Sequence, residues 1–226
     1  MRRGGAPRND GSVNHPLLLV LMTAAGLYFG KLWRDDLREA RKPGGGAAPP
    51  PGFPGATDAP RRAVVIAVDG ALALLALETY LENALGLAAQ QSRMTWLFAL
   101  YSIAAAPIIE ELIFRGWLVI DGSTSLAAGS RGRAVTWAAA VAASAGFAAL
   151  HPFLWRWDDA GFALTLTAKG WFSTTAIFAG SVWFYVARLA VWNPQRSLLP
   201  CFAAHAAKNL GVVAIKATTG FVGGAW

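Results

Sequence analysis

Residues 96–120 read WLFALYSIAAAPIIEELIFRGWLVI, and this stretch sets the fold class of the chain. It is long enough to cross the hydrocarbon core of a bilayer, which takes about 20 mostly apolar residues. Glu110, Glu111 and Arg115 interrupt it. A charged side chain at the bilayer centre costs roughly 2.5–3.5 kcal/mol, so these three must face a protein interior or a wet cavity. The stretch therefore predicts a membrane helix that carries a polar site.

The composition of the whole chain is typical of a membrane protein. Of its 226 residues, 55% are hydrophobic and 15% are charged, and the mean hydropathy is +0.40. In a soluble domain about a quarter of the residues are charged. We therefore expect an all-α fold, a polytopic transmembrane helical bundle with about six membrane helices. The compact build suits a multi-pass integral protein of a bacterial inner (cell) membrane.

The chain divides into three predicted parts. Residues 1–42 hold a basic tail and an anchor helix near 15–33, which lacks an A-x-A cleavage site and is expected to stay uncleaved. Residues 43–62 are rich in Pro and Gly and predict an extended, mobile linker. Residues 63–226 form the predicted helical core, with hydrophobic segments at 63–88, 94–120, 134–155, 168–192 and 198–219.

The positive charge of the chain has a membrane explanation. The formal net charge is +7, but Lys and Arg cluster in short loops and no basic face is interleaved with aromatic residues, so we expect no nucleic-acid partner. Basic residues are more frequent in 31–62 than in 1–15, which predicts that the linker faces the cytoplasm. The single cysteine, Cys201, excludes an intrachain disulfide and a Cys-based zinc site.

The charged residues of the opening stretch fall into a pair and a single carboxylate. On a helix, Glu111 and Arg115 are four residues apart and share a face, so they are expected to pair. Glu110 lies about 100° around the helix from Glu111 and has no cation on the same helix. Glu110 is therefore the candidate general base or acid. The structural alternative is that the helix simply reaches the membrane surface at these residues.

Two further motifs place imidazoles on predicted membrane helices. FAALH puts Phe147 and His151 on one helix face, and HAAKN does the same for His205 and Asn209. The first also fits a histidine at the membrane interface, and the second fits an interhelical hydrogen bond. Lys208 is expected to lie off that face and to extend to the interface. Because buried polar groups need partners, we expect the carboxylates, imidazoles and amide to gather around one cavity.

Three motifs in this order resemble those of the CPBP family of membrane proteases. EELIFR is similar to the EExxxR motif of that family, FAALH to its FxxxH motif and HAAKN to its HxxxN motif. The family includes CAAX prenyl endopeptidases of the Ras-converting type and the bacterial Abi relatives. The resemblance covers about 94–219. It implies an intramembrane endopeptidase that hydrolyses a peptide bond of a membrane-associated polypeptide, which in some relatives is prenylated.

The resemblance also implies catalytic roles. Glu110 matches the glutamate that activates water, and His151 matches a residue that assists proton transfer. His205 and Asn209 match the groups that stabilise the oxyanion. Glu111, the second glutamate of its motif, completes the implied catalytic set.

Two more residues match supporting positions of the same motifs. Arg115 is the arginine of the first motif, and the resemblance implies that its pairing with Glu111 holds the first glutamate in place. Phe147 is the aromatic residue that precedes the histidine of the second motif.

The residues leave two interpretations of the cofactor. The chain has no HExxH motif, so zinc ligands would have to come from separate helices. We expect a metal-free reaction that the glutamate drives. The alternative zinc site, with an open position for water, would use His151, His205 and Glu110.

The expected partners are membrane lipid and a membrane-associated polypeptide substrate. Two other functions remain as alternatives to hydrolysis. In a non-catalytic membrane interaction or immunity factor, the polar cluster would be structural. In a transporter or proton relay it would carry ions, but the absence of an inverted repeat argues against that function.

Overall fold

The computed structural model describes residues 15–42, 52–118, 130–158 and 160–225. In chain order the elements are α1 (Pro16–Ala40), α2 (Arg61–Ala84), η1 (Ala88–Gln90), α3 (Trp96–Ala104), α4 (Ala106–Glu111), η2 (Leu112–Trp117), α5 (Ser130–Leu150), β1 (Trp155–Asp158), β2 (Gly161–Leu164), α6 (Ala168–Leu189) and α7 (Leu199–Thr218).

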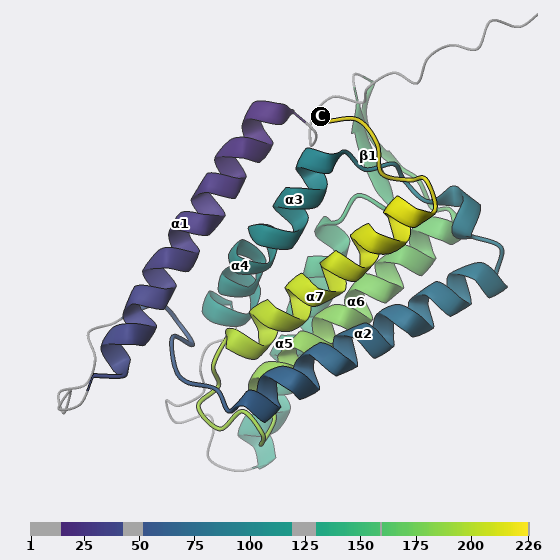
Figure 1. Cartoon of the computed structure of the whole chain (residues 1–226). Coiled ribbons are helices and arrows are strands. Elements are labelled where there is room, and N and C mark those ends of the chain that lie inside the picture. The colour runs from purple at the N-terminus through teal and green to yellow at the C-terminus, as the bar shows by residue number, and fades with distance from the viewer. Residues whose placement is uncertain (1–14, 43–51, 119–129, 159, 226) are drawn as a thin grey trace, which may run out of the picture.

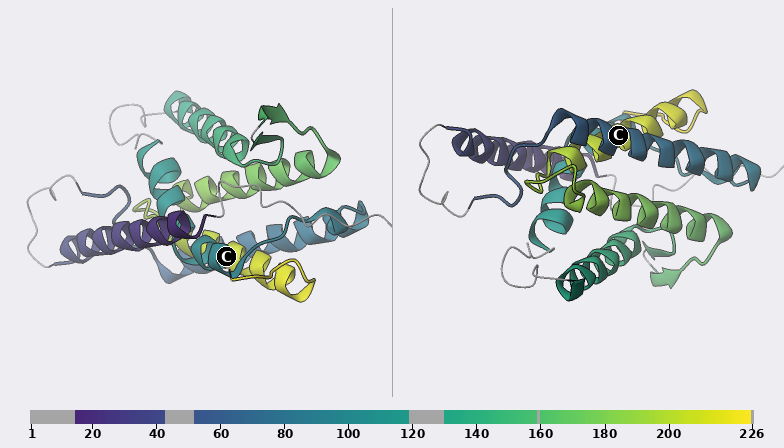
Figure 2. Two further views of the ribbon diagram at one scale, coloured as in Figure 1. Left: turned by 90° about the horizontal axis from the view of Figure 1, so that it is seen from above. Right: turned by 90° about the horizontal axis from the view of Figure 1, so that it is seen from below.

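The long helices form three groups that meet at a common centre (Figure 1). α1 packs beside α3 and α4, α2 beside α7, and α5 beside α6, as the views of Figure 2 also show. α6 contacts both α2 and α7, and α7 contacts both α3 and α4. The arrangement confirms the predicted bundle of helices, in which α6 and α7 join the other groups.

The described helices include several that could cross a membrane. α1, α2 and most of α5 are long and apolar enough, and the bent pair formed by α3 and the helix 106–117 counts as a fourth if it is one span. α6 and α7 reach the length but not the hydropathy, because each carries several polar residues. The helices support a transmembrane bundle, while the predicted number of six is not confirmed.

The predicted helix 94–120 is broken into three pieces. α3 and the helix that comes after it meet at an angle of 40°. Pro107 lies in the first turn of α4, and a proline has no N–H to donate and collides with the carbonyl of the preceding turn. After Glu111 the chain widens into a π-helix, η2. The predicted membrane helix is therefore bent and irregular in the structure.

The predicted helix 134–155 ends earlier than expected, at Leu150. Pro152 disfavours helical backbone at His151. The antiparallel hairpin of β1 and β2 comes next, and Gly161 at its turn has a φ of +99°, which glycine adopts readily. The all-helical prediction missed this hairpin.

The end of the predicted linker, residues 52–60, is held against the bundle. The N–H of Phe53 donates to Asp36 at 2.7 Å, and the N–H of Leu198 donates to the carbonyl of Gly55 at 3.0 Å. The prediction of a mobile connector is wrong for this part, because its backbone groups bind α1 and the α6–α7 connection. The linker before residue 52 lies outside the described residues.

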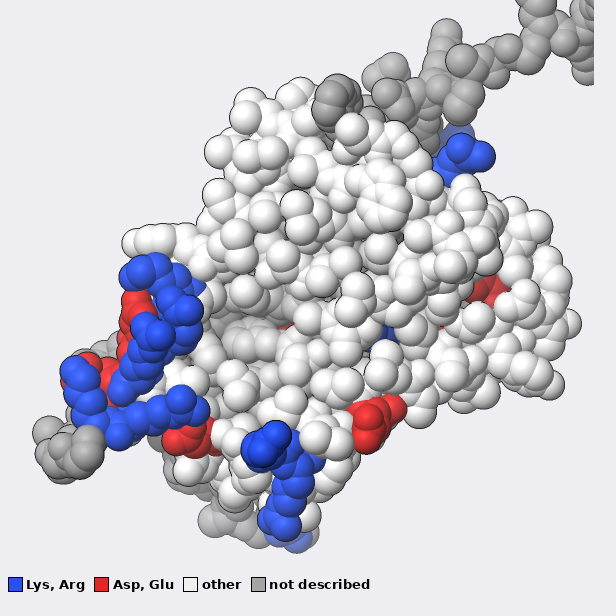
Figure 3. Space-filling view, viewed as in Figure 1, with Lys and Arg blue, Asp and Glu red and all other residues white. Residues whose placement is uncertain are grey.

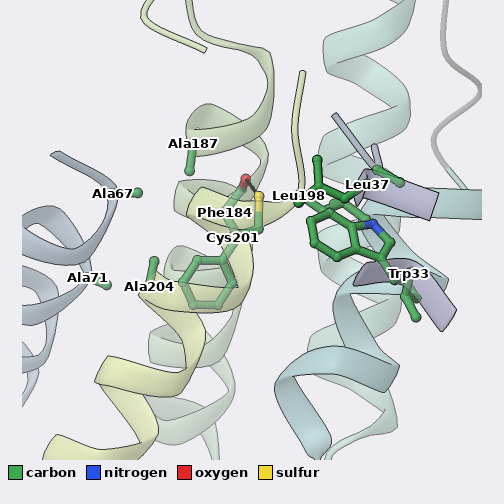
Figure 4. Close-up of a cluster of buried hydrophobic side chains, with 11 residues drawn as sticks. Trp33, Leu37, Ala67, Ala71, Phe184, Ala187, Leu198, Cys201 and Ala204 are labelled. Carbon is green, nitrogen blue, oxygen red and sulfur yellow. Dashed lines mark hydrogen bonds between the residues drawn. The ribbon is translucent and has the colours of Figure 1, made fainter. Parts of the chain in front are cut away.

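The largest cluster of buried hydrophobic side chains joins α1 to the core (Figure 4). Trp33 and Leu37 come from α1, whereas α2 contributes Ala67 and Ala71. Alanines allow neighbouring helices to approach closely. Cys201 is buried in the same cluster, and its Sγ–H donates to a backbone carbonyl of α6 at 3.3 Å.

Basic side chains gather at one end of the molecule. In Figure 3, Lys and Arg lie around the end of α1 and the beginning of α2, below a broad area without charge. The beginning of α5, with Arg133, and the α6–α7 connection, with Arg196, lie at the same end (Figure 1). We call these four segments the basic end. The positive-inside rule predicts that this end faces the cytoplasm.

Gly70 allows α2 to pack closely on α6, which leads to a test of the fold. A Cβ atom at Gly70 would lie 2.0 Å from Cζ2 of Trp183, whose Nε1–H donates to the carbonyl of Ala67 at 2.8 Å. We expect Gly70→Ala to displace the indole and to lower the free energy of unfolding by about 1–3 kcal/mol. Thermal unfolding of the purified protein in detergent measures this loss.

The matched control for this substitution is Gly146→Ala in α5. No heavy atom lies within 4 Å of a Cβ built at Gly146, so the variant should be as stable as the wild type or slightly more stable. Equal unfolding temperatures for the two variants would contradict the packing of α2 on α6.

Candidate functional site

The two glutamates of the first motif differ in burial. The side chain of Glu110, in the last turn of α4, is 25% exposed, whereas that of Glu111 has no exposed surface. In the π-helix after them, the N–H of Leu118 donates to the carbonyl of Ile113 at 2.9 Å, one residue further back than in an α-helix. The carbonyl of Phe114 therefore loses its usual helical partner.

Two side chains of α6 bind carbonyls of the π-helix. The hydroxyl of Tyr185 donates to the carbonyl of Phe114 at 2.5 Å. The guanidinium of Arg188 donates to the carbonyl of Arg115. Both side chains lie in the protein interior. α6 therefore stabilises the irregular backbone next to the two glutamates.

A buried ion pair forms the centre of the site. Nη1 of Arg115 lies 3.2 Å from Oε1 of Glu111, and neither side chain is exposed, which confirms the predicted pairing. The same Oε1 accepts a hydrogen bond from Nδ1 of His205 at 2.7 Å. Nη2 of Arg115 donates to Oγ of Ser181 at 2.5 Å and to its carbonyl at 3.0 Å. The carboxylate of Glu111 and the guanidinium of Arg115 thus connect three parts of the chain, which are segment 106–117, α6 and α7.

Aromatic rings enclose the guanidinium of Arg115. Its Cζ lies 4.8 Å from the ring centre of Phe147, 4.9 Å from that of Tyr185 and 5.4 Å from that of Phe184. A cation over an aromatic face is attracted to the ring, which offsets part of the cost of removing it from water. Phe147 is buried and lies edge-on to Phe114. These contacts fit the supporting position predicted for Phe147.

His205 lies between the two glutamates. Its Nδ1 faces Glu111, and its Nε2 lies 3.6 Å from Oε2 of Glu110. That distance is too long for a hydrogen bond, but it allows one small group to contact both atoms. Because the carboxylate of Glu111 accepts at Nδ1, this nitrogen carries a proton and Nε2 is directed toward Glu110. The imidazole ring stacks on Phe184, with ring centres 4.9 Å apart.

His151 lies just beyond the end of α5 and is held by Phe147. Its Nδ1 lies 2.8 Å from the carbonyl of Phe147. A carbonyl only accepts, so Nδ1 carries the proton and Nε2 of the neutral ring is left to accept one. The ring of Phe147 lies 4.8 Å from His151 and 6.4 Å from His205, measured between ring centres. The two imidazoles therefore flank one aromatic ring.

Asn209 and Lys208 of α7 bind neighbouring helices. Nδ2 of Asn209 donates to the carbonyl of Ser102 on α3 at 2.7 Å, which is the interhelical bond that the sequence allowed and which uses one of the two amide N–H groups. Lys208 is buried, with its Nζ 3.1 Å from Oε2 of Glu78. The prediction that Lys208 extends to the interface is wrong, because α2 supplies a carboxylate within the bundle.

The predicted alternative zinc ligands do not form a metal site as they stand. Among the residues that the structure describes, no three His, Cys, Asp or Glu side chains form a group that could hold a metal ion. Nδ1 of His205 binds Glu111, and Nδ1 of His151 binds a carbonyl. Each imidazole therefore presents only its Nε2 to any further group.

The sequence reasoning missed the contribution of α6. Ser181, Tyr185 and Arg188 bind the π-helix and its arginine. They are spaced at i, i+4 and i+7, which places them on one helix face. Arg188 was the available signal, because an arginine within an apolar helix needs a protein partner.

A comparison with protein families finds one family model that matches the part of the chain that contains the site. A family model described as Type II CAAX prenyl endopeptidase Rce1-like matches residues 92–211. The matched segment contains all three motifs and runs from just before α3 into α7. No curated protein and no solved structure matches the chain.

Removal of Arg115 tests whether the buried pair organises the site. Arg115→Ala leaves the carboxylate of Glu111 buried without its cation, so we expect the free energy of unfolding to fall by about 3–5 kcal/mol. Arg93→Ala, which removes an exposed arginine, should change it by less than about 0.5 kcal/mol. Unfolding in detergent measures both variants. An Arg115→Ala protein as stable as Arg93→Ala would show that the pair is not central.

Proposed function

This chain belongs to the type II CAAX prenyl endopeptidase Rce1-like family, whose model matches residues 92–211, and we propose that it cuts a membrane-associated, prenylated polypeptide with water activated by Glu110. The family is one of CAAX proteases, so the protein is a membrane-embedded peptide hydrolase. The observation that carries the proposal is the position of His205, which binds one glutamate and faces the other across 3.6 Å.

The proposed reaction uses a base, an acid and donors for the developing negative charge. Glu110 takes a proton from water as the water oxygen attacks the carbonyl carbon of the scissile bond. The oxyanion that forms accepts hydrogen bonds from Nε2–H of His205 and from the second N–H of Asn209. The C–N bond then breaks, and the leaving nitrogen receives the proton from Glu110, with Nε2 of His151 as a relay.

The charges around His205 support its role as a donor. Because Nδ1–H already binds Glu111, Nε2 donates a hydrogen bond only when the ring is an imidazolium. With both glutamates ionised and Arg115 positive, an imidazolium makes this group of four side chains neutral. A neutral group avoids the cost of a net charge removed from water.

The contacts support a different task for Glu111 than for Glu110. Glu111 has no exposed surface and holds Nδ1 of His205, so it positions that imidazole rather than touching the substrate. A carboxylate that binds the far nitrogen of a histidine fixes its tautomer and orientation. Arg115 in turn holds Glu111. We propose that no metal takes part, because side chains supply both water activation and oxyanion binding.

The depth of the site supports cleavage near the basic end. His205 lies six residues after Leu199, the first residue of α7, which is about 9 Å along a helix. Glu110 is the partly exposed carboxylate and gives the substrate access. We propose that the lipid-modified polypeptide is held at the cytoplasmic face of a bacterial inner membrane.

Glu110→Gln tests the proposed base. The amide cannot accept the proton of water, so we expect kcat for hydrolysis of a prenylated CAAX peptide to fall by about 10²–10⁴-fold. The fold should persist, because the central ion pair of Arg115 is with Glu111 and not with Glu110. Glu39→Gln, which changes an exposed carboxylate of α1, is the matched control and should leave kcat unchanged.

Two results would contradict the proposed chemistry. Full hydrolysis by the Glu110→Gln protein would remove Glu110 from the reaction. Loss of wild-type activity after strong chelation, together with stoichiometric zinc in the purified protein, would contradict the metal-free reaction. The same peptide without its prenyl group shows whether the lipid is part of what the enzyme recognises.

A further inference from the structure

We propose that the β1–β2 hairpin inserts one apolar face into the headgroup region of the membrane leaflet opposite the basic end. In the register of the two strands, Trp155 pairs with Leu164 and Trp157 pairs with Phe162. Directly opposed residues, and residues two apart on one strand, lie on the same face of a sheet. These four side chains therefore form one face of the hairpin, which we call the aromatic face.

The aromatic face is not covered by the rest of the described protein. Trp157, Phe162 and Leu164 are 71%, 57% and 64% exposed. The ring centres of Trp155 and Trp157 lie 6.2 Å and 6.3 Å from that of Phe162, so the three rings form one patch. Arg156, between the two tryptophans, lies on the other face. A contiguous apolar patch is unfavourable in water, so the aromatic face needs a partner.

The position of the hairpin next to a membrane span identifies lipid as that partner. Residues Gly132–Leu150 of α5 are long and apolar enough to cross a membrane, and β1 begins at Trp155, five residues after the span ends (155 − 150). Because α5 starts at the basic end, the hairpin lies where the span reaches the opposite surface (Figure 1). Tryptophan is enriched where a membrane protein passes from lipid to water.

The backbone of the hairpin restricts it to the headgroup region. Its sheet has two strands, so each strand has an edge that no other described strand pairs with. Backbone N–H and C=O groups along such an edge need water, which the hydrocarbon core does not contain. The headgroup region supplies water to the backbone and apolar surface to amphipathic rings.

Exposed apolar side chains continue the aromatic face onto the neighbouring helices. Leu150 ends α5, Leu166 follows β2 and Trp171 lies in the first turn of α6, and their exposed fractions are 66%, 59% and 54%. The aromatic face is therefore continuous with the surface that α5 and α6 present to lipid.

Hydrogen bonds hold the hairpin in a fixed orientation on the end of α5. Nε1–H of Trp155 donates to the carbonyl of Ala149 at 2.8 Å, and the N–H of Thr165 donates to the carbonyl of Leu154 at 2.8 Å. Little order is therefore lost when lipid contacts the face. None of the catalytic residues belongs to the aromatic face, so lipid binding there stands even if the catalytic assignments fail.

Nitroxide labels on single cysteines test the proposal in the full-length protein, reconstituted into vesicles of phosphatidylglycerol and phosphatidylethanolamine. Oxygen concentrates in lipid and a nickel chelate stays in water, so their collision rates with a label report its surroundings. We expect Phe162→Cys and Leu164→Cys labels to collide more often with oxygen than with nickel. Ala163→Cys, on the other face between them, is the matched control and should show the reverse. The unsubstituted chain measures any background from Cys201, which is buried.

Two results would overturn the proposal. If nickel collides with labels at 162 and 164 as often as with the label at 163, the aromatic face lies in water. If both collision rates are low at 162 and 164 and the labels of separate molecules broaden each other's spectra, a second copy of the chain covers the face instead of lipid.

Discussion

The buried pair of Glu111 and Arg115 is the interaction on which the rest of the structure depends. Neither side chain is exposed, so every partner must come from the protein. The contacts of Arg115 with Ser181 and of Glu111 with His205 bring α6 and α7 to the helix that carries the pair. A buried ion pair adds little net stability compared with apolar packing, but breaking it is costly. Its effect here is to specify how three helices meet.

The same requirement produces the irregular backbone of the site. The 40° bend at Pro107 and the π-helix after Glu111 alter the direction of the chain between two membrane surfaces. Irregular backbone inside a membrane protein is tolerated only where other groups satisfy its carbonyls. Tyr185 and Arg188 do this from α6. Glu111 is thereby fixed in the interior, and its neighbour Glu110 remains partly exposed beside His205. The proposed mechanism of hydrolysis requires this difference between the two glutamates.

Contacts between residues on one helix could be predicted from their spacing, whereas contacts between helices could not. The pairing of Glu111 with Arg115 and the contact of Phe147 with His151 are both four residues apart, so a helical pattern reveals them. The match to a CAAX protease family over 92–211 agrees with the resemblance that the three motifs indicated.

The partners from other helices gave no such local signal. In the sequence, Ser181 and Tyr185 are ordinary residues of an apolar segment. Their contacts become evident only when α6 packs against the π-helix. Lys208 was expected at the membrane surface. Its partner, Glu78, lies 130 residues earlier in the chain (208 − 78), so no local pattern predicted that the two side chains would pair. The break at Pro107 and the end of α5 before Pro152 were readable from the two prolines. The order of residues 52–60 was not, because it comes from contacts with α1 and the α6–α7 connection.

A double-mutant cycle between Glu111 and His205 tests the central claim most directly. The cycle compares kcat for peptide hydrolysis in Glu111→Gln, His205→Gln and the double variant, each verified as folded by circular dichroism. If Glu111 acts by positioning His205, the double variant will be about as slow as the slower single variant, because residues that act as a unit are not additive. If the two reductions in kcat multiply instead, Glu111 acts independently of His205 and the positioning role is contradicted.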